Sequence, residues 1–190
     1  MTINDKALVK LMKSGYKGGG VKIYRYRDDV LFLNGGYWTY VTPWQTAPGN
    51  VLGLIVEWLH TLPAANEGVL AIRGCEGGFE PLDFATSGYG AYLDPGKIDD
   101  IKLLDVHMGG CRAGQLRTKE ICWFDPAALE TMIFPNGSGE LVRVNGEKIG
   151  RWYDANTGSL LYCKALDRID AEVTDKLAEY DFWGGERRDG

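Results

Sequence analysis

Histidine and cysteine, two residue types that often perform catalysis, stand close together at His107 and Cys111, with Arg112 beside them. A thiol next to an imidazole can act as a nucleophile with its base, and the same groups can bind a metal. Their spacing, across Gly109-Gly110, matches no established zinc pattern. A packed cysteine and a surface histidine are the ordinary interpretation. The alternative is a small enzyme or ligand-binding protein that uses these three residues.

Two glycine-rich segments, Gly74 to Gly78 and Gly109 to Gly114, could hold an anion through their backbone amides. Neither continues into Gly-Lys-Ser/Thr, and neither contains Gly-x-Gly-x-x-Gly, the patterns of phosphate-binding loops. The carboxylates Glu76, Glu80 and Asp83 lie near the first segment and are typical of a solvated surface. The four cysteines also lack a metal-binding spacing. The sequence therefore predicts no cofactor and no metal site.

Aromatic residues gather in one stretch, which contains Tyr37, Trp38, Tyr40 and Trp44. Strand alternation places Trp38 and Tyr40 on one face and Tyr37 on the other. One face can belong to the core. The other can be an exposed anchor, because Trp and Tyr are enriched in interface hot spots. We therefore predict that Trp38, Tyr40 and Trp44 contact a partner.

Charge is spread unevenly along the chain, whose net charge is −5. Residues 1–27 carry +6, residues 28–110 carry −8, residues 111–164 carry +1 and residues 165–190 carry −4. We predict that the acidic middle, with Asp99, Asp100 and Asp105, binds a partner with a basic surface in a salt-sensitive manner. The same charge disfavours direct nucleic-acid binding, although Lys22 to Arg27 alternates basic and aromatic residues.

The first half of the chain shows the periodicities of a helix, a strand meander and a second helix. Thr46 is the expected N-cap of the second helix, and Pro63 ends it. This helix should pack across the first sheet. The expected helices are 4–14 and 47–61, and the expected strands are 21–27, 30–34, 37–42 and 69–73.

The second half repeats this order in outline, without a residue-level repeat. Asp94-Pro95 should start a helical turn, Asn145-Gly146 is a strong hairpin signal, and Asp170 should cap the last helix. The loop 109–114 should separate two strands. The expected strands are 101–108, 115–124, 140–144, 148–153 and 159–164, and the expected helices are 125–133 and 171–180.

Strands joined by short turns favour antiparallel sheets, so the predicted fold class is α+β. We expect an N-terminal and a C-terminal meander, each packed with helices, in a single compact domain over residues 1–183. Residues 1–90 and 91–183 are candidate halves, and residues 184–190 should form a flexible tail.

The composition disfavours a membrane-spanning or secreted protein. Of 190 residues, 45% are hydrophobic, enough for a core, and no apolar run approaches the roughly 20 residues of a membrane span. The first ten residues lack the apolar region of a signal peptide, so we expect a cytoplasmic protein that does not bind membranes.

Our first functional hypothesis is a non-enzymatic protein-binding module. Small acidic chains without a catalytic signature are common among phage and mobile-element accessory proteins. Some of those inhibit host defence complexes, including CRISPR effectors, by occupying a basic groove. The expected partner is a protein or ribonucleoprotein with a basic surface. Exposed aromatic strands also allow a homodimer.

Overall fold

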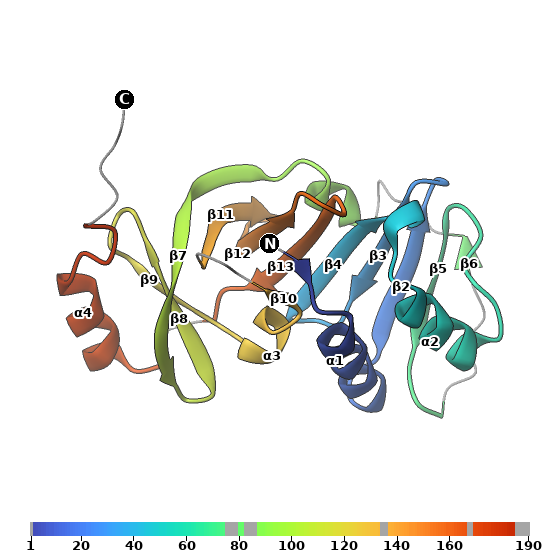
Figure 1. The fold of residues 1–190 in the computed structure, drawn as a ribbon, viewed down its shortest axis with the longest axis horizontal. Helices are drawn as coiled ribbons and strands as arrows, with labels where there is room; N and C mark the ends of the chain where they lie inside the picture. Colours follow the sequence, from blue (N-terminus) through green and yellow to red (C-terminus); the bar gives the residue numbers. More distant parts are fainter. Residues whose placement is uncertain (1, 75–79, 82–86, 134–136, 167–168, 185–190) are drawn as a thin grey trace.

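One antiparallel sheet of 11 strands runs through the protein (Figure 1). The computed structural model describes residues 2–74, 80–81, 87–133, 137–166 and 169–184. The strand order is β6-β5-β2-β3-β4-β13-β12-β11-β7-β8-β9. The strands are β2 (Val21–Tyr26), β3 (Val30–Asn34), β4 (Trp38–Pro43), β5 (Glu67–Ala71), β6 (Glu80–Pro81), β7 (Gly96–Met108), β8 (Cys111–Leu116), β9 (Ile121–Phe124), β11 (Ser138–Val144), β12 (Glu147–Asp154) and β13 (Ser159–Lys164).

The helices and a second, two-stranded sheet lie around this main sheet (Figure 1). The small sheet pairs β1 (Thr2–Ile3) with β10 (Met132–Ile133). The α-helices are α1 (Asp5–Lys17), α2 (Gly49–Leu59), α3 (Pro126–Leu129) and α4 (Ala171–Glu179), and the 3-10 helices are η1 (Trp44–Thr46) and η2 (Tyr89–Tyr92). None of the helices in the described part of the chain is long and apolar enough to cross a membrane.

The mixture of helices with antiparallel strands confirms the predicted class, but the expectation of two separate meanders, each packed with helices, is wrong. The last strand of the N-terminal meander, β4, pairs with β13, so both meanders belong to one sheet. Trp38 lies opposite Cys163, and Val41 lies opposite Leu160. This pairing joins residues about 120 positions apart, and no local pattern encodes it.

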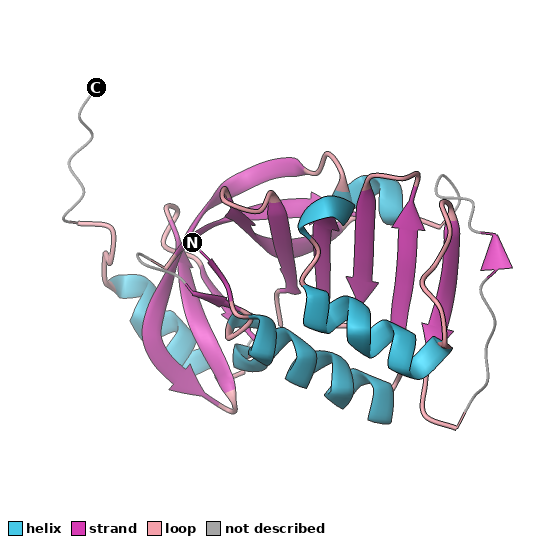
Figure 2. Cartoon of the chain, turned by 45° about the vertical axis from the view of Figure 1, so that its right-hand side comes forward, coloured by secondary structure: helices cyan, strands magenta, loops and turns pink. Residues whose placement is uncertain are grey.

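In the N-terminal part of the sheet, α1 and α2 cover one face (Figure 2). Leu8 and Met12 of α1 and Val51 and Ile55 of α2 are fully buried in a core shared with strands β2 and β3. The predicted packing of the second helix across the first sheet is confirmed. Thr46 is not the N-cap of this helix. Pro48 occupies the N-cap position, and no side chain makes a capping hydrogen bond there.

The C-terminal strands bury their inner face by curling rather than by accepting a pair of helices. Beyond β13, Leu166 forms an isolated antiparallel bridge with Trp123 of β9, so the strands from β13 to β9 curl toward a closed barrel (Figure 1). Trp152 lies fully buried inside, and its ring meets that of Phe124 edge to face at 5.3 Å. Gly150 leaves space for the Trp152 ring.

Several local expectations are corrected by these pairings. Residues 109–114, expected as a loop, contain a two-residue turn and most of β8, because Gly109 and Gly110 both take positive φ and reverse the chain tightly. The helical turn lies at 89–92, ahead of Asp94-Pro95. The Asn145-Gly146 hairpin is confirmed, with φ of 49° and 86°. Asp170 caps α4 as expected. The predicted tail 184–190, apart from Gly184, lies outside the described residues.

The sheet face opposite α1 and α2 carries a tyrosine-rich cluster. Tyr24, Phe32 and Tyr162 are buried there beneath η2, which supplies Tyr89 and Tyr92. The Tyr162 hydroxyl donates to the carbonyl of Tyr92 at 2.6 Å. At the far end of the same face, α4 packs on β8 and β9 in a third cluster. The face between η2 and α4 has no helix on it in the described part of the chain.

Candidate functional site

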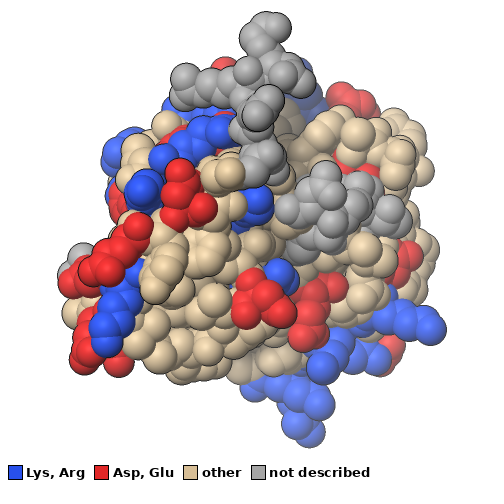
Figure 3. All heavy atoms as spheres, turned by 60° about the vertical axis from the view of Figure 1, so that its left-hand side comes forward, with Lys and Arg blue, Asp and Glu red and all other residues tan. Residues whose placement is uncertain are grey.

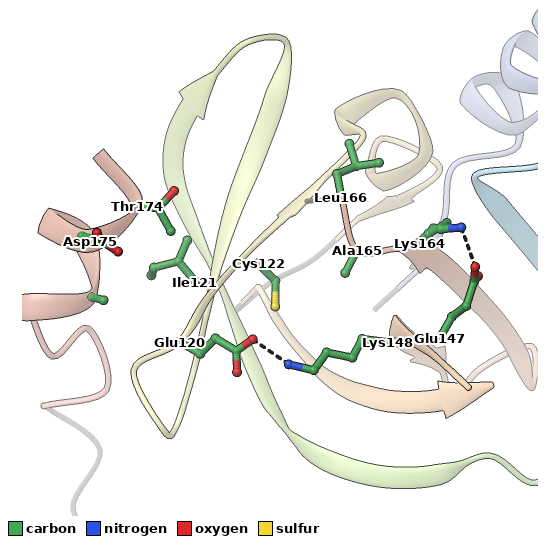
Figure 4. A pocket seen from close by; sticks show the side chains of 11 residues that line it. Glu120, Ile121, Cys122, Glu147, Lys148, Lys164, Ala165, Leu166, Thr174 and Asp175 are labelled. Carbon is green, nitrogen blue, oxygen red and sulfur yellow. Dashed lines mark hydrogen bonds and ion pairs between the residues drawn. The ribbon is translucent and has the colours of Figure 1, made fainter. Parts of the chain in front are cut away.

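A cleft of about 640 Å³ lies where the curled strands stop short of closing, between β9, the ends of β12 and β13, and α4 (Figure 4). Its floor is apolar and its rim is charged. The lining residues are Glu120, Ile121, Cys122, Glu147, Lys148, Lys164, Ala165, Leu166, Thr174, Asp175 and Ala178. Elements from three parts of the chain therefore build this cleft, and only the tertiary fold brings them together.

Two ion pairs lie on its rim (Figure 4). The Lys148 ammonium lies 2.7 Å from Glu120, and the Lys164 ammonium lies 2.6 Å from Glu147. The hydrogen bond from Glu120 raises the pKa of Lys148. All four side chains are about half exposed, so each pair contributes at most about 1 kcal/mol to stability. Together with Asp175, the residues that line the cleft carry three carboxylates and two cations.

Cys122 is the one cysteine among the residues that line the cleft. Burial, with a smaller contribution from the nearby Glu120 carboxylate, raises the pKa of the Cys122 thiol to about 12. The thiol therefore stays protonated at neutral pH, and a protonated thiol is a poor nucleophile. Cys122 thus contributes to the apolar lining of the cleft rather than a thiolate.

An acidic stripe lies along α4, which forms one wall of the cleft. Glu172, Asp175 and Glu179 recur at helical spacing on one side of the helix, and Asp175 lines the cleft. The opposite side places Leu177 against β8 and β9. Glu172 forms an exposed pair with Lys176 at 2.6 Å. Over residues 169–184, five carboxylates accompany a single lysine.

Specific hydrogen bonds hold α4 and the segment after it on the sheet. The Trp123 indole donates to the Thr174 hydroxyl at 3.2 Å. The fully buried Gln115 side chain donates to the carbonyl of Tyr180 at 2.7 Å and accepts from the amide of Phe182 at 2.9 Å. The Trp183 indole donates to the backbone carbonyl of Gln115 at 3.2 Å. The acidic stripe is therefore displayed on a fixed support.

His107, Cys111 and Arg112 lie around the β7–β8 turn, away from this cleft. His107 pairs with Arg112 across the hairpin, and Met108 pairs with Cys111. Because successive strand residues face opposite sides, His107 and Cys111 point to opposite faces of the hairpin. Burial also raises the pKa of the Cys111 thiol, with a smaller contribution from Asp125. Arg112 donates to the carbonyl of Leu104 at 2.8 Å. The geometry brings together no nucleophile and base.

The other glycine-rich segment, 74–78, lies outside the described residues apart from Gly74, as do Glu76 and Asp83. Within the described part of the chain, no group of three or more His, Cys, Asp or Glu residues could hold a metal ion.

The aromatic residues predicted to contact a partner are mostly inside the molecule. Trp38 is 4% exposed and Tyr40 is fully buried, so neither is available as an anchor on this surface. The Tyr40 hydroxyl donates to Ser159 at 3.1 Å instead. Trp44 is half-buried beneath the Arg25 guanidinium, 4.0 Å from the centre of its ring. Both faces of this strand are covered, because Trp38 and Tyr40 lie in the core shared with α1 and α2, and Val41 lies in the cluster that includes Tyr89 of η2.

Two of the three predicted acidic contacts are already paired within the chain. Asp100 meets Lys97 at 2.7 Å and Arg117 at 2.9 Å, and these two cations lower its pKa. Asp99 accepts hydrogen bonds from its neighbour's amide and from Thr118. Asp105 is exposed.

The pairing of Asp100 belongs to a longer chain of alternating charges across the open sheet face. Lys97 also meets Glu140 at 3.3 Å, and Glu140 pairs with Arg151. Three cations thus accompany two carboxylates. Figure 3 shows acidic and basic side chains interspersed over the end of the molecule that includes α4. Residues 169–184, which include α4, keep an acidic excess, with five carboxylates and one lysine.

The residues that form the cleft were not singled out by sequence reasoning. The one available signal was the net charge of −4 over residues 165–190. Glu120, Lys148 and Lys164 give no local signal, because their association depends on how far the strands curl.

Comparison of the chain with protein-family models, with curated proteins and with solved structures finds no match.

Proposed function

We propose that this protein is a non-enzymatic protein-binding module whose contact surface is the end of the molecule that carries α4. The observation that supports this proposal is the acidic stripe Glu172, Asp175 and Glu179, displayed beside the cleft. A stripe of carboxylates attracts a basic protein surface and speeds its association. The partner is therefore a protein or ribonucleoprotein with a basic surface.

The firm docking of α4 favours recognition. A partner that binds a rigid surface loses less conformational freedom on binding than one that must order a mobile helix. Gln115, Thr174 and Trp183 provide this rigidity through the hydrogen bonds that join α4 and residues 180–183 to the sheet. Tyr180, 64% exposed at the end of α4, adds an aromatic contact of the type enriched in interface hot spots.

A basic groove that normally holds nucleic acid is the partner surface that this proposal favours. Carboxylates on a rigid support would occupy positions that phosphates otherwise take, and nucleic-acid binding would be inhibited. This is the mode of action expected of a phage or mobile-element protein that blocks a host defence complex such as a CRISPR effector. The same carboxylates argue against direct binding of nucleic acid at this end.

Charge reversal on α4 tests the proposal. The double variant Glu172→Lys, Glu179→Lys changes the stripe, whereas Glu57→Lys, Glu130→Lys makes the same charge change on α2 and beside α3. The tagged full chain is used to capture proteins from host cells at low and at high salt. We expect a partner that is lost at high salt, lost with the α4 variant and retained with the control.

Equal capture by both double variants would overturn the proposal. His107→Ala serves as a further control, because His107 neither lines the cleft nor belongs to the apolar cluster on which α4 packs. Loss of capture in this variant would assign the contact to the β7–β8 hairpin instead.

A further inference from the structure

A second hollow, of about 480 Å³, lies at the ends of β2, β3 and β13. The cleft described above lies on the other side of β13. Two glycine turns form part of its wall, one after α1 and one between β3 and β4. The lining residues are Gly19, Gly20, Lys22, Asn34, Gly35, Gly36, Tyr37, Leu70 and Lys164. The volume is within the range of small-molecule sites.

The charge of this hollow is opposite to that of the whole chain. Lys22 and Lys164 line it, and no carboxylate is among the described residues that do so, although the chain has a net charge of −5. Lys164 also pairs with Glu147, which lies outside the lining. Lys22 from β2 and Lys164 from β13 both line this hollow, and two cationic residues suit an anion larger than a single carboxylate.

An exposed aromatic ring and an oriented amide lie between the two lysines along the sheet. Tyr37 is 60% exposed, and its backbone carbonyl accepts from the amide of Lys164 at 2.8 Å. Asn34 donates to the Thr39 hydroxyl at 2.7 Å and accepts from the amide of Gly36 at 3.2 Å. Its second amide hydrogen remains for a ligand. A flat ring beside a fixed donor suits the base of a nucleotide.

The glycines that line this hollow have no side chain to cover their backbone. A Cβ at Gly19 or at Gly36 would meet no atom within 4 Å. Gly36 takes a φ of 89°, which favours glycine, but Gly19 has no such backbone requirement and no crowding. Close approach of a ligand to the backbone would explain why a glycine stands at position 19.

We propose that this hollow binds a nucleoside phosphate, with Lys22 and Lys164 on the phosphates and Tyr37 against the base. The glycine-rich segments 74–78 and 109–114 were the sequence-based candidates for an anion site. The proposed site lies instead at the shorter glycine turns 18–20 and 35–36. It shares Lys164 with the cleft but includes none of the carboxylates of the α4 stripe.

The test is a titration of the full chain with fluorescent mant-ADP, followed by anisotropy. We expect saturable binding that unlabelled ADP competes away, and at least about tenfold weaker competition by adenosine or by inorganic phosphate alone, since each retains only part of the contacts. Lys22→Gln and Tyr37→Ala should each weaken binding by about tenfold, which corresponds to about 1.4 kcal/mol.

Matched controls are Lys10→Gln on α1 and Tyr153→Ala on β12, both at exposed positions. These variants should bind mant-ADP as the unchanged protein does. Absence of saturable binding up to millimolar mant-ADP would overturn the proposal. Equal weakening by the control variants would overturn it too, because it would assign the binding to general charge or to the dye.

Discussion

The two ends of the sheet bury their apolar faces in different ways. The strands β2 to β5 lie beneath α1 and α2, so two helices cover their inner face (Figure 2). The strands β7 to β9 and β11 to β13 curl around Trp152 and Phe124. Curling leaves a cleft where the strands do not fully close, and a single helix, α4, stands beside it. The candidate protein-binding surface therefore lies at the end whose core depends on strand curvature.

Loss of the Trp152 ring should give the largest effect. Trp152→Ala removes a fully buried ring from inside the curled strands, and we expect the free energy of unfolding to fall by about 3–5 kcal/mol. Trp58→Ala is the control at the helical end, where the ring is only partly buried against Tyr16 at a centroid distance of 4.2 Å. Urea unfolding measures both. Equal losses of unfolding free energy in the two variants would contradict the prediction that the curled end depends more strongly on a single ring.

Glycine substitutions should change stability in opposite directions at the two ends. A Cβ at Gly150 would lie 2.5 Å from the Trp152 ring and 2.8 Å from the Phe124 ring, so we expect Gly150→Ala to destabilise by about 1–3 kcal/mol. Gly53 is exposed within α2, with no atom within 4 Å of an added Cβ. Gly53→Ala should stabilise by about 0.5–1 kcal/mol. Thermal and urea unfolding give both signs, and a stabilising Gly150→Ala would show that the rings have room to move.

Release of α4 should have the smallest destabilising effect. Gln115→Ala removes the side-chain hydrogen bonds to Tyr180 and Phe182, and we expect a loss of about 1 kcal/mol, since each bond contributes about 0.5–1.5 kcal/mol and the segment can open locally. Limited proteolysis should cut near α4 faster than in the unchanged protein. Gln45→Ala, at an exposed position before α2, is the control. An unchanged cleavage rate would mean that other contacts hold α4.

Sequence reasoning succeeded where the signal was local. Helical periodicity predicted α1, α2 and α4, with Asp170 as a cap, and Asn145-Gly146 predicted a hairpin. It did not foresee the burial of both Trp38 and Tyr40, because alternation separates two faces but does not say which face another part of the chain will cover. It also placed Cys111 in a loop, whereas residues 111–114 belong to β8.

The sequence by itself determined a mixed helix and antiparallel-strand protein, a surplus of negative charge near the C-terminus and the absence of familiar catalytic patterns. Only the tertiary structure decided that β4 pairs with β13 and that the last six strands of the sheet curl toward a barrel. It also decided that Asp99 and Asp100 are paired within the chain. The physical reason is the sequence distance over which each interaction acts. Helix capping, periodicity and turn chemistry act over a few residues. Strand pairing, sheet curvature and charge pairing depend on residues far apart in sequence.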